Sequence, residues 1–195
     1  MNFLEIFFSS IKLILTLDPL LFEIIILSLK VSFTALIVSS FFAVIIGYIL
    51  ALKKFFLKNI LIIVFNSLMG IPPVVVGLIV YFLLARGGPL GVLQLLYTPS
   101  AMIIAQSIII FPIVVSLSHE IFSQQWLQFR DHFRVFNIPL VGTMLTLIRH
   151  SYVVLITILL TGFGRAISEV GAVMIVGGNI EHYTRMMTTS ITLET

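Results

Sequence analysis

The sequence predicts an all-α integral membrane protein whose 195 residues form a single transmembrane domain, residues 1-195, with four spans. Three observations predict this class. Hydrophobic residues make up 59% of the chain and charged residues only 10%, against about 45–50% and 25% in soluble domains. The mean hydropathy is +1.20, and apolar runs are separated by short basic or Gly/Pro-rich connections. The length has room for four to six spans of about 20 residues each.

The N-terminal residues 3–17 form a short apolar run that contains Glu5 and Lys12 and is stopped by Asp18-Pro19. A helix of about 15 residues would cover only about 22 Å, so we expect an interfacial helix there and not a span. The segment lacks the basic start and small-residue cleavage site of a signal peptide, so we expect it to be retained. The first predicted span follows, at about residues 23-52.

The second and third predicted spans each contain proline. The second covers about residues 60-84 and is interrupted by Pro72 and Pro73, which remove backbone donors and bend or break a helix. Such a break is tolerated at membrane depth where protein or a cavity covers it, and a plain packing kink is an equal alternative. The third span, about residues 99-117, contains Gln106 and Pro112.

A polar stretch, residues 119-150, separates the third span from the fourth, which is expected at about residues 151-176. The centre of this stretch is too polar to cross a bilayer, but its apolar side chains suit a short amphipathic helix after a loop. Those side chains are Phe129, Phe133, Val135, Phe136 and Ile138. They fit a partner's groove, with the neighbouring charges fixing the register; the alternative is a helix that lies on the membrane surface.

Basic residues predict the topology, because Lys and Arg accumulate in short cytoplasmic loops. With four spans, two connections share one side, and their basic residues are Lys53, Lys54, Lys58, Arg130, Arg134 and Arg149. The other side has Arg86 and Arg185. We therefore place residues 119-150 in the cytoplasm and the tail from Gly177 to Thr195 outside.

The same sequence argues against several function classes. The absence of cysteine excludes disulfides, thiolate nucleophiles and Cys-ligated metals. The histidines lie in the cytoplasmic loop and the opposite tail, and no phosphate-binding Gly-x-x-x-x-Gly-Lys-Ser/Thr loop is present. We expect no catalytic residue, no metal, no cofactor and no nucleic-acid partner. The chain should be a transport component in contact with membrane lipid, and any ATP hydrolysis should occur in a separate subunit.

The stretch from Thr161 to Ile180 places Arg165 and Glu169 inside an apolar, Gly-punctuated run. Each charge at the bilayer centre would cost about 2.5–3.5 kcal/mol on insertion scales, so such residues usually face a protein interior or a watery path. One interpretation is a functional pair, and the other is a structural pair that locks neighbouring helices. The Gly-Gly that precedes Asn179 could offer amides to an anion, or could simply end the helix.

Four or five helices are too few to enclose a path for a substrate. We therefore expect two copies of the chain to pair as a homodimer. At this point three stretches resemble the permeases of binding-protein-dependent ABC importers, the small type I bundle, and within it the tungstate and molybdate type. The stretches are Ser28 to Ser32, Gly70 to Leu78 and Gly162 to Ile180. The resemblance implies oxyanion import through a bacterial or archaeal plasma (inner) membrane. It also implies cytoplasmic ABC ATPase subunits and an extracytoplasmic substrate-binding protein as partners.

Two features depart from that family. Its coupling loop has the pattern Glu-Ala-Ala, three residues, then Gly; here Asn137 takes the Gly position, and of Asp131, His132 and Phe133 only the first matches in character. Relatives generally continue past the Thr-Arg-Met-Met-Thr-Thr stretch into a further span, so the last family span is expected to be missing. Another substrate, such as sulfate, phosphate or an amino acid, is the alternative, followed by a non-ABC channel or scaffold.

Two sets of site residues follow. The residues expected to couple to the ATPase are Arg130, Asp131, His132, Phe133, Arg134, Phe136, Asn137 and Ile138. The residues expected to form the translocation pathway or its gate are Pro72, Pro73, Gln106, Arg165, Glu169 and Asn179.

Overall fold

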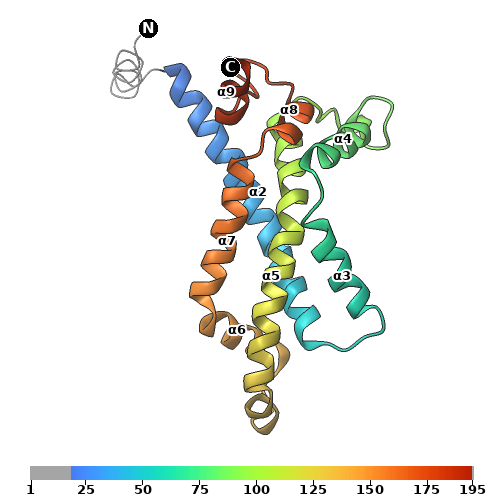
Figure 1. The fold of residues 1–195 in the computed structure, drawn as a ribbon, viewed down its shortest axis with the longest axis vertical. Helices are drawn as coiled ribbons and strands as arrows, with labels where there is room; N and C mark the ends of the chain where they lie inside the picture. Colours follow the sequence, from blue (N-terminus) through green and yellow to red (C-terminus); the bar gives the residue numbers. More distant parts are fainter. Residues whose placement is uncertain (1–18, 195) are drawn as a thin grey trace.

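The computed structural model describes residues 19–194, and all regular secondary structure within this range is helical. The predicted interfacial helix at residues 3–17 lies outside the described residues. The helices are α2 (Pro19–Leu52), α3 (Lys58–Leu68), α4 (Pro73–Leu84), the 3-10 turn η1 (Gly91–Leu93), α5 (Pro99–Val135), α6 (Leu140–His150), α7 (Tyr152–Ile167), α8 (Gly171–Gly177) and α9 (Met187–Glu194). Figure 1 shows α4, α8 and α9 gathered at one end of an elongated bundle and α6 at the other.

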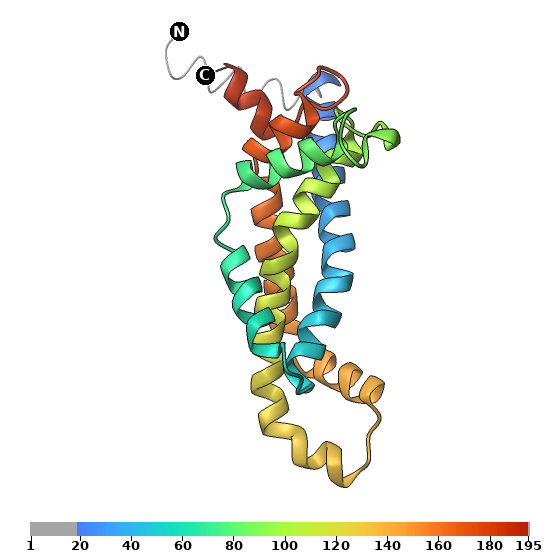
Figure 2. The same cartoon turned by 90° about the vertical axis from the view of Figure 1, so that its right-hand side faces the viewer.

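The two longest helices, α2 and α5, pack against each other along much of their length (Figures 1 and 2). Small residues allow this close approach: a Cβ added at Gly47 would lie 2.8 Å from the Cβ of Ser118 and 2.9 Å from the amide nitrogen of His119. At 1.5 Å per residue the helices are about 51 and 55 Å long, which exceeds the roughly 30 Å hydrocarbon core of a bilayer. Both therefore extend beyond the membrane.

Two shorter helix pairs complete the bundle. Helices α3 and α4 meet at a bend of 103°, and α6 and α7 at 79°. The predicted interruption at Pro72 and Pro73 is confirmed, because α3 ends at Leu68 and α4 begins at Pro73. In the described range α2 and α5 are long and apolar enough to cross a membrane, and four spans result if each bent pair counts as one.

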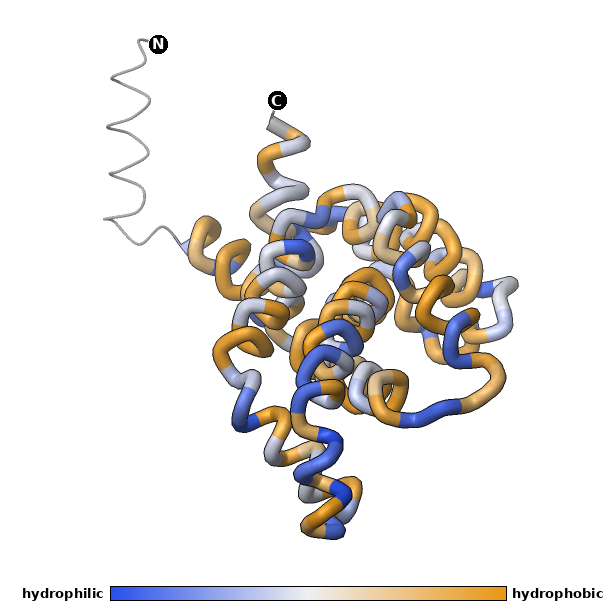
Figure 3. Tube along the Cα trace, turned by 60° about the horizontal axis from the view of Figure 1, so that its bottom comes forward, coloured by the Kyte–Doolittle hydropathy of each residue, from blue (hydrophilic) through white to orange (hydrophobic). Residues whose placement is uncertain are grey.

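The loop expected directly after the third span was wrong, since α5 continues as one helix through Val135. No Pro or Gly occurs between Pro112 and Pro139, so nothing local stops the helix after Leu117. Pro112 itself stays inside the helix. Residues 119-135 are therefore a helical extension, and only residues 136–139 connect it to α6. Figure 3 shows hydrophilic residues concentrated where α5 continues past the bundle.

The fourth span was expected at about residues 151-176, and the structure divides this range between two helices. Helix α7 ends at Ile167, and α8 starts as a separate short helix at Gly171. The chain turns here because α8 packs closely against α4: a Cβ at Gly77 would lie only 2.7 Å from the Cα of Ala172. The charged pair singled out by the sequence lies at this turn.

The basic connections gather at one end of the bundle. Helix α2 ends and α3 begins at the same end as α6 (Figure 1). The opposite end holds the tail, which folds back on α2: the amide of Met187 donates to Ser28 Oγ at 2.9 Å, and His182 Nδ1 lies 2.8 Å from Glu23 Oε2. Two buried apolar clusters fill the bundle, one around Phe122 and Leu147 and one around Met102 and Val176.

Candidate functional site

The ion pair between Arg165 and Glu169 is present, with Nη1 of the guanidinium 3.4 Å from Oε2 of the carboxylate. The two residues do not share a continuous helix. Arg165 is in the last turn of α7, and Glu169 lies in the connection that follows. The Glu169 side chain is 4% exposed and the Arg165 side chain 34%. The carboxylate is thus enclosed by protein, while the guanidinium reaches toward open space.

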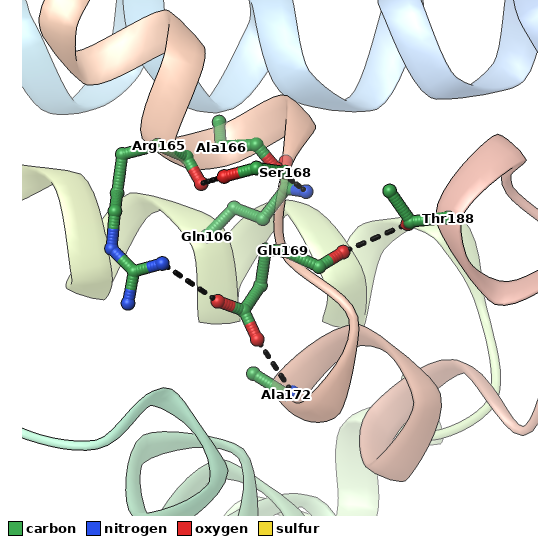
Figure 4. A network of polar contacts seen from close by, with 7 residues as sticks. All are labelled: Gln106, Arg165, Ala166, Ser168, Glu169, Ala172 and Thr188. Carbon is green, nitrogen blue, oxygen red and sulfur yellow. Dashed lines mark hydrogen bonds and ion pairs between the residues drawn. The ribbon is translucent and has the colours of Figure 1, made fainter. Parts of the chain in front are cut away.

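Glu169 joins three helices at this point (Figure 4). Its second carboxylate oxygen, Oε1, accepts a hydrogen bond of 3.0 Å from the amide of Ala172 in the first turn of α8. Its backbone carbonyl accepts a 2.9 Å bond from Thr188 Oγ1 of α9. A carboxylate at a helix start satisfies an amide that has no partner in the helix and is favoured by the helix dipole. Glu169 therefore fixes α8 and α9 to the end of α7.

Gln106 connects α5 to the same junction. Its side chain is fully buried, and Nε2 donates a 3.0 Å hydrogen bond to the carbonyl of Ala166. Its Oε1 is buried without a hydrogen-bond partner among the described residues. Three of the predicted pathway residues, Gln106, Arg165 and Glu169, are thus brought together from α5, α7 and the α7–α8 connection.

The other predicted pathway residues lie apart from this junction. Pro72 and Pro73 form the start of α4, which reaches the junction through its packing on α8. Asn179 has a positive φ of 49°, and its Nδ2 lies 3.4 Å from the carbonyl of Thr189. It holds the tail in place and makes no contact with Arg165 that the structure records.

A cavity of about 410 Å³ lies beside Arg165. Its walls come from α2, from α3 and the segment after it, from α4 and α5, and from Arg165 of α7. They include Val38, Ser39, Phe42, Phe65, Leu68, Met69, Ile71, Val76, Ser107, Ile108, Ile109, Phe111 and Pro112. Arg165 is the only charged residue in this lining, and it is already paired. The cavity is therefore apolar, with one neutralised cation at its wall.

Sequence reasoning missed the serines of this wall. Ser39 is 3% exposed and its hydroxyl has no partner among the described residues, while Ser107 Oγ lies 3.4 Å from the carbonyl of Ala35. Both interrupt long apolar runs, which was the available signal. It was too weak to use, because serines in membrane helices commonly bond to their own backbone.

The predicted coupling residues form a projecting lobe from the end of α5 to the start of α6. Arg130 and Arg134 lie 3.7 and 3.9 Å from Asp131, and all three side chains are exposed. Phe136 is 71% exposed. The lobe also contains an apolar pocket that His132, Phe133 and Ile138 help to line.

The assignment of Phe133 to a contact surface needs correction. Its side chain is only 7% exposed and stacks on Trp126, with the ring centroids 6.0 Å apart. It stabilises the lobe from inside, whereas Val135, 77% exposed, faces outward. Asn137 has a φ of 48°, the left-handed conformation for which glycine is the default residue. A glycine, the residue of the family pattern at this position, would fit this backbone without strain.

The fold and the site define a multi-pass α-helical membrane protein with a polar junction beside an apolar cavity. No group of three or more His, Asp or Glu side chains in residues 19–194 is arranged to hold a metal ion. No protein-family model matches the chain.

Similar proteins show the family. The chain is 40% identical over 189 residues to the tungstate uptake system permease protein TupB of Peptoclostridium acidaminophilum, covering 97% of this chain and 83% of that protein. It is 39% identical over 172 residues to a probable anion ABC transporter permease protein of Haloferax volcanii, covering 86% and 74%. A second TupB, from Campylobacter jejuni, is 37% identical over 145 residues, covering 73% of this chain and 59% of that protein.

The chain belongs to the family of ABC transporter permeases. It is accordingly a multi-pass plasma-membrane protein and a transport subunit, not a catalytic one. This excludes the non-ABC channel or scaffold that the sequence left open.

Proposed function

We propose that the chain is the permease of an ATP-driven importer for an oxyanion, with tungstate as the first candidate and molybdate as the next. The observation that carries this is the 40% identity, over nearly the whole chain, to a tungstate uptake permease. A relative named only as an anion permease supports the broader class. Sulfate, phosphate and amino acids remain the competing substrates, because importer selectivity resides largely in the binding protein.

The junction around Glu169 is proposed as a gate and not as a storage site for the anion. The cavity next to Arg165 is walled almost entirely by apolar side chains, and a hydrophobic constriction closes a path by excluding water. A hydrated dianion would bind poorly there while Glu169 neutralises the arginine. Separation of α7 from α8 would break the ion pair and leave the Arg165 guanidinium free to attract an anion. Gln106, Pro72, Pro73 and Asn179 would hold the surrounding backbone.

A second copy of the chain is proposed to complete the path. Helix α3 buries none of its eleven residues within one chain, although it is largely apolar. Its exposed surface also carries Asn66 and Ser67, polar side chains that are unfavourable against lipid tails. Pairing through this helix would cover both kinds of residue, and would place the cavity beside Arg165 near the axis of a homodimer.

The projecting lobe is proposed to dock on a cytoplasmic ATPase subunit. It combines exposed apolar side chains, Val135 and Phe136, with the charges of Arg130, Asp131 and Arg134, as a helix-in-groove contact requires. ATP binding would draw the two lobes together, and rigid-body motion would open the gate toward the external binding protein.

The decisive test is uptake into vesicles that contain the chain together with its ATPase subunit, with the substrate-binding protein added. We expect ATP-dependent accumulation of labelled tungstate, reduced by molybdate but not by sulfate. Uptake of sulfate or an amino acid with equal efficiency would refute the substrate assignment. No ATP-dependent uptake of any oxyanion would refute the function.

Docking is tested by copurification of the ATPase subunit with a Val135→Ser/Phe136→Ser variant. We expect at least a tenfold loss, because exposed apolar anchors contribute most of the affinity in such contacts. Phe82→Ser is the matched control, since Phe82 is 67% exposed on α4 at the other end of the bundle. Undiminished copurification of the double variant would rule out this surface.

A further inference from the structure

A small apolar groove lies between the end of α2 and the start of α6. It has a volume of about 210 Å³ and is lined by Ile45, Tyr48, Ile49, Leu52, Lys53, Leu140, Val141 and Met144. Lys53 is the only charged residue in this lining. Tyr48 Oη donates a 2.7 Å hydrogen bond to the carbonyl of Leu140, which ties α6 to α2 beneath the groove.

The charges around the groove are unbalanced. Lys53 and Lys54 follow the last residue of α2, and no ion pair of either lysine is present among the described residues. Lys58, by contrast, donates from Nζ to the carbonyl of Ala51 at 3.3 Å and so caps α2. Lys53 therefore lies in the lining of an apolar groove without an ion pair among the described residues, and Lys54 follows it directly in the chain.

The position of the groove matches the boundary between lipid headgroups and acyl chains. The connection from Lys53 to Leu57 contains Phe56, which is 96% exposed, and Phe55, which is 40% exposed. Aromatic side chains interleaved with lysines are typical of a membrane interface, and both helices that leave this connection are apolar.

We propose that this groove binds an anionic phospholipid, with one acyl chain against the side chains of α2 and α6 and the phosphate held by Lys53 and Lys54. Charge complementarity favours this occupant over a second copy of the chain or a zwitterionic lipid. Because Leu140 and Val141 begin α6, the lipid would brace the projecting lobe against α2. The binding site stands whether or not the chain imports oxyanions.

The test is lipid binding to the purified protein, measured by native mass spectrometry with phosphatidylglycerol and with phosphatidylcholine. We expect preferential retention of phosphatidylglycerol, and an affinity about 25-fold lower in a Lys53→Gln/Lys54→Gln variant, about fivefold per lysine. Lys53→Arg/Lys54→Arg keeps the charge and should restore most of the binding. Lys30→Gln, which removes an exposed lysine from the other half of α2, is the matched control.

A second variant tests the groove separately from the charges. Val141 is 71% exposed at the groove wall, so Val141→Trp should fill the groove without disturbing the core and should weaken phosphatidylglycerol binding. Glycerol phosphate, which has the headgroup charge but no acyl chain, should not compete. Equal binding by the Lys53→Gln/Lys54→Gln and Lys30→Gln variants, or no effect of Val141→Trp, would overturn the proposal in favour of unspecific lipid contact. Crosslinking of the groove to a second copy would overturn it as well.

Discussion

Removal of Arg165 should destabilise the protein more than neutralisation of Glu169, because the two members of the pair have different surroundings. Breaking a buried ion pair from one side costs about 3–5 kcal/mol, mostly from the charge left behind. In Arg165→Ala the remaining carboxylate is 4% exposed and keeps only the amide of Ala172. Since the guanidinium is 34% exposed, the loss should lie below that range, at about 2 kcal/mol.

Glu169→Gln should cost about 1 kcal/mol, because the amide oxygen still accepts from Ala172 and the guanidinium can turn toward the cavity. The double variant should also cost about 1 kcal/mol, well below the sum of the single losses, since it contains neither charge. The measurement is equilibrium unfolding by SDS titration in mixed micelles, where about 2 kcal/mol corresponds to about a 30-fold change in the folded-to-unfolded ratio. Arg149→Ala, at an exposed arginine of α6, is the control.

The reasoning would be refuted if the two single variants lost equal free energies of unfolding and the double variant lost their sum. Such an additive result means that the charges do not stabilise each other. Unchanged stability with abolished uptake would instead show that the pair acts only in transport.

Two further outcomes follow from other contacts. Gly77→Val should cost about 1–3 kcal/mol in the same titration, because any Cβ at this position meets the backbone of Ala172, whereas Gly164→Ala, with open space around it, should be neutral or stabilising. The hydrogen bond that His182 Nδ1 donates to the Glu23 carboxylate raises the pKa of His182 above its usual value of 6.5. The stability from this contact is therefore fully present below pH 6.5 and is lost as the pH rises through the raised pKa. The protection factors of residues 181–194 in hydrogen exchange, taken relative to the intrinsic exchange rate at each pH, should fall over that window, and His182→Ala should abolish this fall.

The sequence by itself determined the class of protein and several local features. The free energy of transferring an apolar side chain out of water is favourable in any fold. The composition was therefore enough to predict membrane helices. Pro72 and Pro73 remove two successive amide donors, so the sequence predicted an interruption there and left a break or a kink as alternatives; the single Pro112 does not break α5. The spacing of Arg165 and Glu169 likewise allowed their contact, and the pair is present in the structure.

Only the tertiary structure decided where the helices end and which side chains are buried. Residues 119-135 were expected to contain a loop before a short amphipathic helix, but polar side chains are equally compatible with a solvated helix, and α5 continues through them. Phe133 and Phe136 are alike in sequence, yet one stacks on Trp126 and the other is exposed. The end of α7 depends on contacts from α5 and α9 and on the packing of α8 against α4, and these elements are contributed by distant parts of the chain. Local sequence sets the free energy of burying a residue, whereas the partners that bury it are chosen by the whole fold.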